Sequence, residues 1–343
     1  MKKWIALALA AALILTMLSS ALAVDEVKLP KLQYKANNYV AYLDKELYIE
    51  MKVLSGGNLP ADAVVELRDE KGSVWMTKAF RGKAKNVGFR MTMTEAQLGG
   101  HALNLWYGDE KITQEDLRVF ISDQSKKPMK RVETDQPYMA ITLDCGFYGD
   151  NTDVVLKLLD EFGVKCTFFF TGYFVRFFPE EARRIRDAGH EIGNHSMWHP
   201  ALTKENRAKQ ISEILYASEY IREELGVAPR LFRPPYGDID SAVTAIARAG
   251  GMEAIMWTID SHDWDAKYTA DKVFKRVTKN ITPGMIILFH LDGYACEENL
   301  RRALDYYINE LGLQVVPVTK LMEIGGLELP DCPELPEDTP TAA

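Results

Sequence analysis

The sequence predicts an α/β fold of about seven strands, a parallel barrel or an open sheet, preceded by a small all-β domain. From residue 138 onward, short β-branched or aromatic runs alternate with segments whose apolar residues recur at helical spacing. Between residues 39 and 122, only short strand-like runs occur, separated by glycine-rich turns. With 343 residues, of which 47% are hydrophobic, the chain exceeds what one ordinary core organises.

The amino terminus has the layout of a secretory signal peptide. Two lysines precede an apolar stretch that runs to Leu18, and the triplet Ala21-Leu22-Ala23 supplies the small residues of a cleavage site. We therefore predict a signal peptide over residues 1–23 and a protein that is secreted or associated with the cell envelope. The alternative is an uncleaved N-terminal anchor, because about 20 apolar residues can span a bilayer.

The segment 24–122 is predicted to form a β-sandwich-like domain, because its runs have regular strand spacing without helical periodicity. The expected strands are 46–54, 63–68, 73–80, 87–93, 102–107 and 116–122. A spacer role is at least as consistent with this pattern as glycan binding.

Residues 123–137 carry four basic residues, two prolines and little apolar content, which predicts a linker. The second domain is expected over 138–326, and the acidic, proline-rich end, 327–343, is expected to be disordered. The strands predicted in this domain are 138–143, 164–170, 190–193, 230–232, 253–259, 285–289 and 313–318.

Reactive side chains follow several of these strands. They are Asp144, Cys145, His195, His199, Arg233, Asp260, Asp263 and His290. The carboxyl ends of parallel strands meet at one edge of a sheet or barrel, so these side chains are expected to gather there. Imidazoles with additional carboxylates and a further histidine are the groups that a metal-dependent hydrolase needs.

Five short motifs occur in order after the strands. They are Thr142-Leu143-Asp144-Cys145-Gly146, His195-Ser196-Met197-Trp198-His199-Pro200, Arg233-Pro234-Pro235-Tyr236-Gly237, Asp260-Ser261-His262-Asp263-Trp264 and Leu288-Phe289-His290. In this order they resemble the polysaccharide deacetylase family, carbohydrate esterase family 4, over about residues 138–322. The resemblance implies a distorted (β/α) barrel that removes acetyl groups from an amino-sugar polymer such as peptidoglycan with the help of a divalent metal, often zinc.

The same resemblance implies the roles of single residues. His195 and His199 would be metal ligands, Asp144 the general base, and His290 the general acid oriented by Asp263. Arg233 would pair with Asp144 and keep it ionised, since a neighbouring cation lowers the pKa of a carboxyl group. The backbone N–H of Tyr236 is implied as an oxyanion donor, and the rings of Tyr236 and Trp264 offer flat walls for a sugar.

Cys145 stands where the family usually has a second aspartate as the third metal ligand. A thiolate binds zinc well, so a Cys-His-His site is one interpretation. Alternatively, the two histidines and water molecules hold the metal and Cys145 is a bystander. In the third interpretation, catalysis is lost and sugar binding is retained.

The remaining composition limits the partners. A formal net charge of −8 argues against nucleic acid and fits a glycan substrate, and no protein partner is evident. Cys166 is expected to be a small core residue, and Cys296 with Cys332 could form a disulfide. The competing functions are an inactive or weakly active carbohydrate-binding relative and an esterase acting on O-acetylated glycans.

Overall fold

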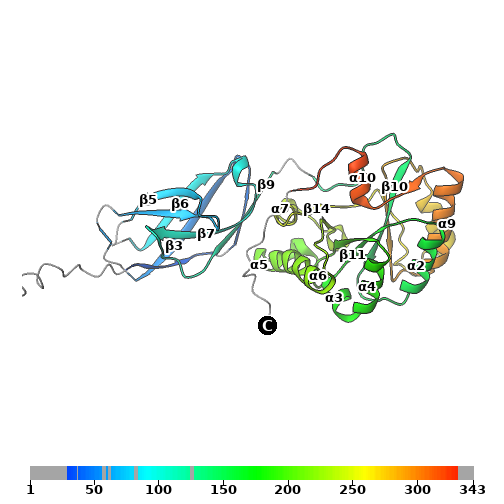
Figure 1. Ribbon diagram of the computed structural model, residues 1–343, viewed down its shortest axis with the longest axis horizontal. Coiled ribbons are helices and arrows are strands. Elements are labelled where there is room, and N and C mark those ends of the chain that lie inside the picture. Colours follow the sequence, from blue (N-terminus) through cyan, green and yellow to red (C-terminus); the bar gives the residue numbers. More distant parts are fainter. Residues whose placement is uncertain are drawn as a thin grey trace, which may run out of the picture. The chain divides into compact units, whose positions relative to one another are not determined.

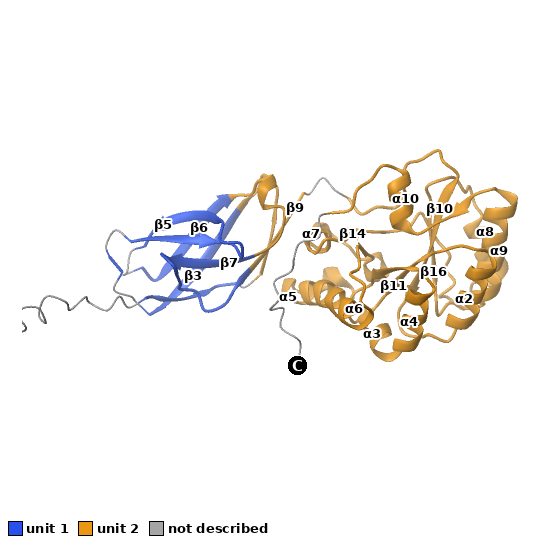
Figure 2. Cartoon of the chain, in the orientation of Figure 1, with its two compact units in different colours: residues 1–37, 47–91, 102–117 blue, residues 38–46, 92–101, 118–343 orange. Residues whose placement is uncertain are grey.

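The computed structural model describes residues 29–330 except 37, 56–58, 61–62, 81–83 and 124–126 (Figure 1). The predicted signal peptide and most of the predicted tail lie outside this range. The chain forms two compact units (Figure 2). The first comprises residues 1–37, 47–91 and 102–117, and the second comprises 38–46, 92–101 and 118–343. The single boundary expected at residue 122 therefore differs from this division, which assigns 38–46, 92–101 and 118–122 to the second unit.

The region before residue 123 is all-β, as predicted. Its strands are β1 (Lys31–Tyr34), β2 (Asn38–Tyr42), β3 (Glu46–Ser55), β4 (Val64–Arg68), β5 (Val74–Ala79), β6 (Asn86–Thr92), β7 (Gly99–Tyr107), β8 (Glu110–Lys111) and β9 (Leu117–Ser122). Hydrogen bonding joins β1, β3 and β6 in one sheet and β2, β9, β7, β4, β5 and β8 in another. Sequence periodicity missed only the short strands β1, β2 and β8.

Alternation of buried and exposed side chains gives this region its core. Ile49 and Met51 of β3 are fully buried while their neighbours along the strand are more exposed, as expected when one face of an antiparallel sheet packs inward. The Tyr34 hydroxyl donates a buried hydrogen bond of 2.8 Å to the Leu103 carbonyl. This bond ties the sheet of β1 to the sheet of β7, which agrees with a sandwich.

The second unit alternates strands and helices from residue 138 onward. Its strands are β10 (Tyr138–Cys145), β11 (Thr167–Phe170), β12 (Glu191–Asn194), β13 (Leu231–Phe232), β14 (Glu253–Ala254), β15 (Ile259–Asp260), β16 (Ile286–His290) and β17 (Gln314–Val315). Its α-helices are α2 (Thr152–Glu161), α3 (Gly172–Phe177), α4 (Pro179–Asp187), α5 (Arg207–Ile211), α6 (Ala217–Leu225), α7 (Ser241–Ala249), α8 (Ala270–Val277), α9 (Cys296–Asp305) and α10 (Val318–Ile324). Shorter turns include the π turns η3 (Ser212–Tyr216) and η5 (Tyr306–Glu310) and the 3-10 turns η1 (Glu95–Gln97), η2 (Leu202–Lys204) and η4 (Pro235–Gly237).

The strands of this unit form a curled parallel sheet in the order β14-β13-β12-β11-β10-β16-β15, with β17 paired to the start of β10. Helices pack around it (Figure 1). The strand expected over 253–259 is split, so that β14 and β15 form the two ends of the sheet. Only residues 255–258 join these two ends. Because four linking residues reach at most about 18 Å, the sheet must curl until its edges approach each other. The result is the distorted barrel that the sequence predicted.

The segment expected to be a linker is partly built into this barrel. The Met129 N–H donates to Ala254 O at 2.8 Å, and the Met256 N–H donates to Met129 O at 2.6 Å. Val132 is fully buried in a core with Ile255. The linker prediction is therefore wrong for this part, because basic composition did not reveal backbone pairing with a strand more than 100 residues away.

No helix within the described ranges is long and apolar enough to cross a membrane.

Candidate active site

A cavity of about 400 Å³ opens at the carboxyl ends of the barrel strands. Its lining residues are Asp144, Gly146, Phe147, His195, His199, Tyr236, Trp257, Asp260, Trp264, Leu288, His290 and Asp292. The sequence analysis proposed a role for nine residues, and six of these nine line the cavity directly. Arg233 and Asp263 lie behind it in contact with Asp144 and His290, respectively. Cys145 is the exception.

Asp144 is held as a carboxylate by Arg233. The Nη1 atom of Arg233 donates to Asp144 Oδ1 at 2.7 Å and to Thr142 Oγ1 at 2.8 Å. Burial favours the neutral acid, but the charge and hydrogen bond of Arg233 and the charge of His290 outweigh it and lower the pKa of Asp144 below its usual value. The carboxylate is therefore ionised near neutral pH, as a general base must be.

Arg233 itself is fully buried, which requires compensation for its charge. Besides Asp144, its Nη2 donates to the Met256 carbonyl at 3.2 Å, and its Cζ lies 4.1 Å from the centroid of the Phe169 ring. The structure shows that this ring faces the guanidinium, a contact that no local pattern indicates.

His195 and His199 lie side by side, with ring centroids 4.8 Å apart. His195 Nδ1 donates to the Arg233 carbonyl at 2.7 Å, which leaves Nε2 as an acceptor 3.4 Å from Asp144 Oδ2. Burial lowers the pKa of His195, and burial together with His195 lowers that of His199 to about 3. Both rings are therefore neutral at pH 7. The buried Nδ1 of His199 has no hydrogen-bond partner among the described residues.

The loop between the two histidines is backed by the π turn η3. Glu213, which is fully buried, accepts the Met197 N–H at its carbonyl (2.9 Å) and the Trp198 N–H at its carboxylate (2.7 Å). Ser196 and His199 have φ values of 67° and 59°. Such left-handed conformations cost about 1–3 kcal/mol each and persist only where the surroundings fix them. Glu213 is such a support, and sequence reasoning did not identify it.

His290 and Asp263 form the second charged pair of the site. His290 Nδ1 donates to Asp263 Oδ1 at 2.8 Å, and the His290 N–H donates to Oδ2 at 3.0 Å. Burial lowers the pKa of His290, but the bond to Asp263 and the carboxylates of Asp263, Asp144 and Asp260 outweigh it and raise the pKa to about 9. Asp144 and His290 are partners in the register of neighbouring strands. An ionised carboxylate and a protonated imidazole thus stand side by side.

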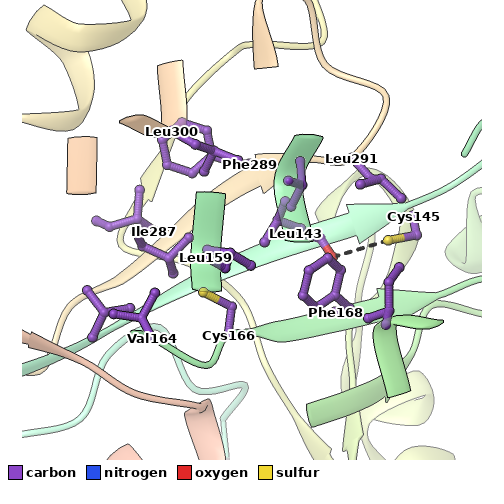
Figure 3. Packing of buried hydrophobic residues seen from close by; sticks show 14 of the residues in the cluster. Leu143, Cys145, Leu159, Val164, Cys166, Phe168, Ile287, Phe289, Leu291 and Leu300 are labelled. Atoms are coloured by element: carbon purple, nitrogen blue, oxygen red, sulfur yellow. Dashed lines mark hydrogen bonds between the residues drawn. The ribbon is translucent and has the colours of Figure 1, made fainter. Parts of the chain in front are cut away.

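Cys145 lies on the other face of β10 (Figure 3). Side chains alternate along a strand, so Asp144 points to the cavity while Leu143 and Cys145 join the hydrophobic core. The Cys145 sulfur is 3.8 Å from the Leu143 carbonyl oxygen, and the residue has no exposed surface. Burial and the charge of Asp144 raise the pKa of this thiol well above its ordinary value. The thiol therefore does not join the two histidines in this structure.

Several cavity residues were missed or assigned otherwise from the sequence. Asp292 and Phe147 were not identified, although each follows a motif by one or two residues. Trp257 also lines the cavity and had no role in the predicted site. Tyr236 and Trp264, predicted as sugar walls, are 70% and 51% exposed at the rim.

Cys166, Cys296 and His190 do not line the cavity. Cys166 is buried in the core, as expected, and His190 Nδ1 accepts the Cys166 N–H at 3.2 Å, in agreement with a structural role. Cys296 is buried with its sulfur 3.7 Å from the His290 carbonyl oxygen. Cys332 lies outside the described residues, so its disulfide with Cys296 stays a prediction.

The chain belongs to the polysaccharide deacetylase family. The family model for polysaccharide deacetylases matches residues 131–255. The chain is 36% identical over 196 residues to a chitooligosaccharide deacetylase from Bradyrhizobium sp. (strain ANU 289), and the match covers 53% of this chain and 89% of that protein. Other relatives are named peptidoglycan-N-acetylglucosamine deacetylases.

Two further similarities bear on the interpretation of the site. Uncharacterized protein YlxY from Bacillus subtilis (strain 168) is 32% identical over 205 residues, which cover 60% of this chain and 63% of YlxY. The crystal structure of a CE4 family pseudoenzyme from Bacillus anthracis superposes with a TM-score of 0.55 and 28% identity. That match covers 58% of this chain and 69% of that one. The solved structures that resemble this chain therefore include one that is described as a pseudoenzyme of the same family.

Proposed function

We propose that this protein hydrolyses N-acetyl groups of an amino-sugar polymer, with peptidoglycan as the expected substrate. The observation that carries the proposal is the pairing, on one cavity, of an ionised Asp144 with a protonated His290. Arg233 and Asp263 push the two protonation states in opposite directions. The names of the relatives, which include peptidoglycan and chitooligosaccharide deacetylases, support the same reaction class.

The proposed chemistry assigns one proton transfer to each pair. Asp144 accepts a proton from a water molecule as its oxygen attacks the acetyl carbonyl carbon. His290 then donates a proton to the leaving amine, so that the C–N bond breaks and acetate is released. Each positioned group of this kind contributes about 10²- to 10⁴-fold to the rate.

The developing oxyanion needs a donor, and we assign this role to the Tyr236 backbone N–H. Tyr236 has a φ of 59°, and the hydrogen bonds of its turn are donated by the N–H groups of Gly237 and Asp238. Those bonds do not use the Tyr236 N–H. Because the turn fixes the Tyr236 N–H in place, this donor need not reorganise when negative charge develops on the acetyl oxygen.

The residues as placed do not fit a complete metal site. His195 and His199 offer neutral imidazoles, and the buried Nδ1 of His199 has no hydrogen-bond partner within the described part of the chain. A catalytic zinc site, however, takes three protein ligands, and Cys145 faces the core. Within the described ranges, no three His, Cys, Asp or Glu side chains are grouped to hold a metal. The two proton transfers are therefore assigned without a metal, and metal analysis of the purified protein would test the prediction of zinc.

The position of Cys145 favours a second candidate, a glycan-binding relative without turnover. The same cavity and its rim aromatics would hold the sugar, while the missing third donor would prevent catalysis. This candidate differs from the first in one measurable property, the release of acetate.

The deciding experiment is incubation of the purified protein with peptidoglycan fragments, chitooligosaccharides and acetylated xylan, with and without added zinc. Mass spectrometry then follows loss of acetyl mass and its position. Loss from an N-acetyl sugar supports the proposed function, and loss from xylan alone supports the esterase. Binding without any loss of acetyl, with or without zinc, would establish the second candidate.

Export also stays a proposal. A polymer substrate outside the cell agrees with the predicted signal peptide over residues 1–23, which lie outside the described ranges. Comparing the mass of the mature protein from the native host with that of the full chain would test cleavage after Ala23.

A further inference from the structure

Beside the cavity lies a group of aromatic side chains that the reaction does not use. Phe147 lines the cavity, and its ring centroid is 5.3 Å from that of Tyr173. Tyr173 in turn contacts Phe177 at 4.5 Å and Trp198 at 6.3 Å. Phe177 and Trp198 are 54% and 43% exposed, so together they present adjacent aromatic surface to solvent beside the cavity. We call Tyr173, Phe177 and Trp198 the aromatic shelf.

The shelf is fixed to the histidine loop by backbone contacts. The N–H groups of Gly172 and Tyr173, which begin α3, donate to the carbonyls of Ser196 and Met197 at 3.0 and 2.9 Å. A Cβ atom at Gly172 would lie 2.0 Å from the Met197 sulfur, so any larger residue would force the buried Met197 side chain to move. The position of the shelf is therefore set by the same loop that carries His195 and His199.

Arg176 adds a positive charge to the shelf. Its Cζ lies 5.9 Å from the ring centroid of Phe177 and 6.0 Å from that of Trp198. The side chain is exposed, and no carboxylate in the described part of the chain forms an ion pair with it. Neighbouring arginines on α4 differ in this respect, because Arg183 pairs with Glu180 and Arg184 pairs with Asp153.

The aromatic shelf and Arg176 together fit a ligand that has both a sugar ring and a carboxylate. The face of a sugar ring is made of C–H groups and packs on aromatic rings, while a guanidinium binds a carboxylate through two parallel hydrogen bonds. The chain carries a formal charge of −8, so it would repel an acidic polymer without such a local cation. A neutral chitin-like polymer would leave Arg176 without a partner.

We propose that Arg176 and the aromatic shelf bind a sugar that carries a carboxylate, next to the sugar whose acetyl group is removed. This inference rests on the proposed function and narrows its substrate class to acidic amino-sugar polymers. The carboxylate can belong to the lactyl group of N-acetylmuramic acid or to an attached peptide.

Binding measurements separate this inference from catalysis. Isothermal titration calorimetry would compare a tetrasaccharide of alternating N-acetylglucosamine and N-acetylmuramic acid with the same compound in which the lactyl carboxylates are amidated. A third arm uses the tetrasaccharide with its peptides attached, and a fourth uses chitotetraose. We expect the parent to prefer the free carboxylate to the amide by about two- to fivefold at low salt, the upper part of the range for an exposed charge pair.

Three variants test which residue provides the preference. Arg176→Gln should reduce the ratio of the two affinities to about one, and Arg176→Lys should keep part of it, because the charge remains without the paired donors. Arg184→Gln, which removes the same charge from the neighbouring helix, should leave the ratio at the parental value. If only the peptide-bearing compound shows the preference, the carboxylate is that of the peptide.

Two outcomes would overturn the inference. One is a parent that binds neither the free lactyl compound nor the peptide-bearing compound more tightly than the amidated tetrasaccharide. The other is an Arg176→Gln variant that weakens chitotetraose and the acidic compounds by the same factor, which indicates packing alone. Absence of acetate release from every compound would count against the proposed function, whereas the affinity ratio would still test the role of Arg176.

Discussion

Replacement of Asp263 by asparagine should move the alkaline limit of activity. The substitution keeps the shape of the side chain but removes the charge that His290 contacts at 2.8 Å. The pKa of His290, about 9 against an ordinary 6.5, corresponds to roughly 3 kcal/mol of preference for the imidazolium. In Asp263→Asn, burial is opposed only by the carboxylates of Asp144 and Asp260. We therefore expect the pKa of His290 to fall to 6.5 or below.

The assay is acetate release as a function of pH between 5 and 10. For the parent, kcat/KM should decline above about pH 9, when His290 loses its proton. For Asp263→Asn the decline should begin near pH 6.5 or lower, so that activity at pH 8 drops by about thirtyfold, the inverse of the fraction still protonated. Asp265→Asn, two residues further along the loop, is the control and should keep the parental profile.

The His290–Asp263 pair should also make the free energy of unfolding depend on pH. A folded-state pKa above the unfolded value means that the stabilisation is complete below pH 6.5 and is lost as pH rises through about 9. Urea unfolding of the parent at pH 6 and pH 9.5 should therefore show a decrease of up to about 3 kcal/mol from this group, less the part screened by solvent at a side chain that is 20% exposed. Asp263→Asn should lack this decrease. An unchanged alkaline limit in the variant would refute the assignment of His290 as an acid held by Asp263.

Four further predictions concern the other groups of the site. Asp144→Asn should lower kcat by about two to four orders of magnitude, the range for a positioned base, and near-normal turnover would contradict its assignment. His195→Ala should abolish any tight zinc binding measured by titration, since it removes one of the two imidazoles at the cavity, and retained binding would place the metal elsewhere. Cys145→Ala should leave zinc affinity unchanged and cost about 1 kcal/mol of stability for the lost core sulfur, whereas a loss of affinity would identify the thiol as a ligand. Cys145→Asp should instead raise affinity and turnover if its carboxylate turns toward the histidines.

The sequence alone determined the order of secondary structure and the gathering of polar groups at one end of the barrel. Strand and helix periodicities are local, so they were readable without the fold, and parallel strands necessarily bring their carboxyl ends together. Asp144, His195, His199 and His290 therefore line one cavity, as predicted. The motifs also indicated Arg233 and Asp263, which contact Asp144 and His290 from behind.

Tertiary structure decided the features that depend on contacts between distant segments. The split between β14 and β15 follows from backbone pairing with Met129, and the support of the histidine loop by Glu213 follows from a π turn in a later helix. The sequence placed Cys145 beside Asp144, but only the pleat of β10 turned its thiol into the core. Likewise, Arg176 is an ordinary helical arginine in sequence. Its contact with Trp198 arises because α3 packs against a loop that lies twenty residues further along the chain.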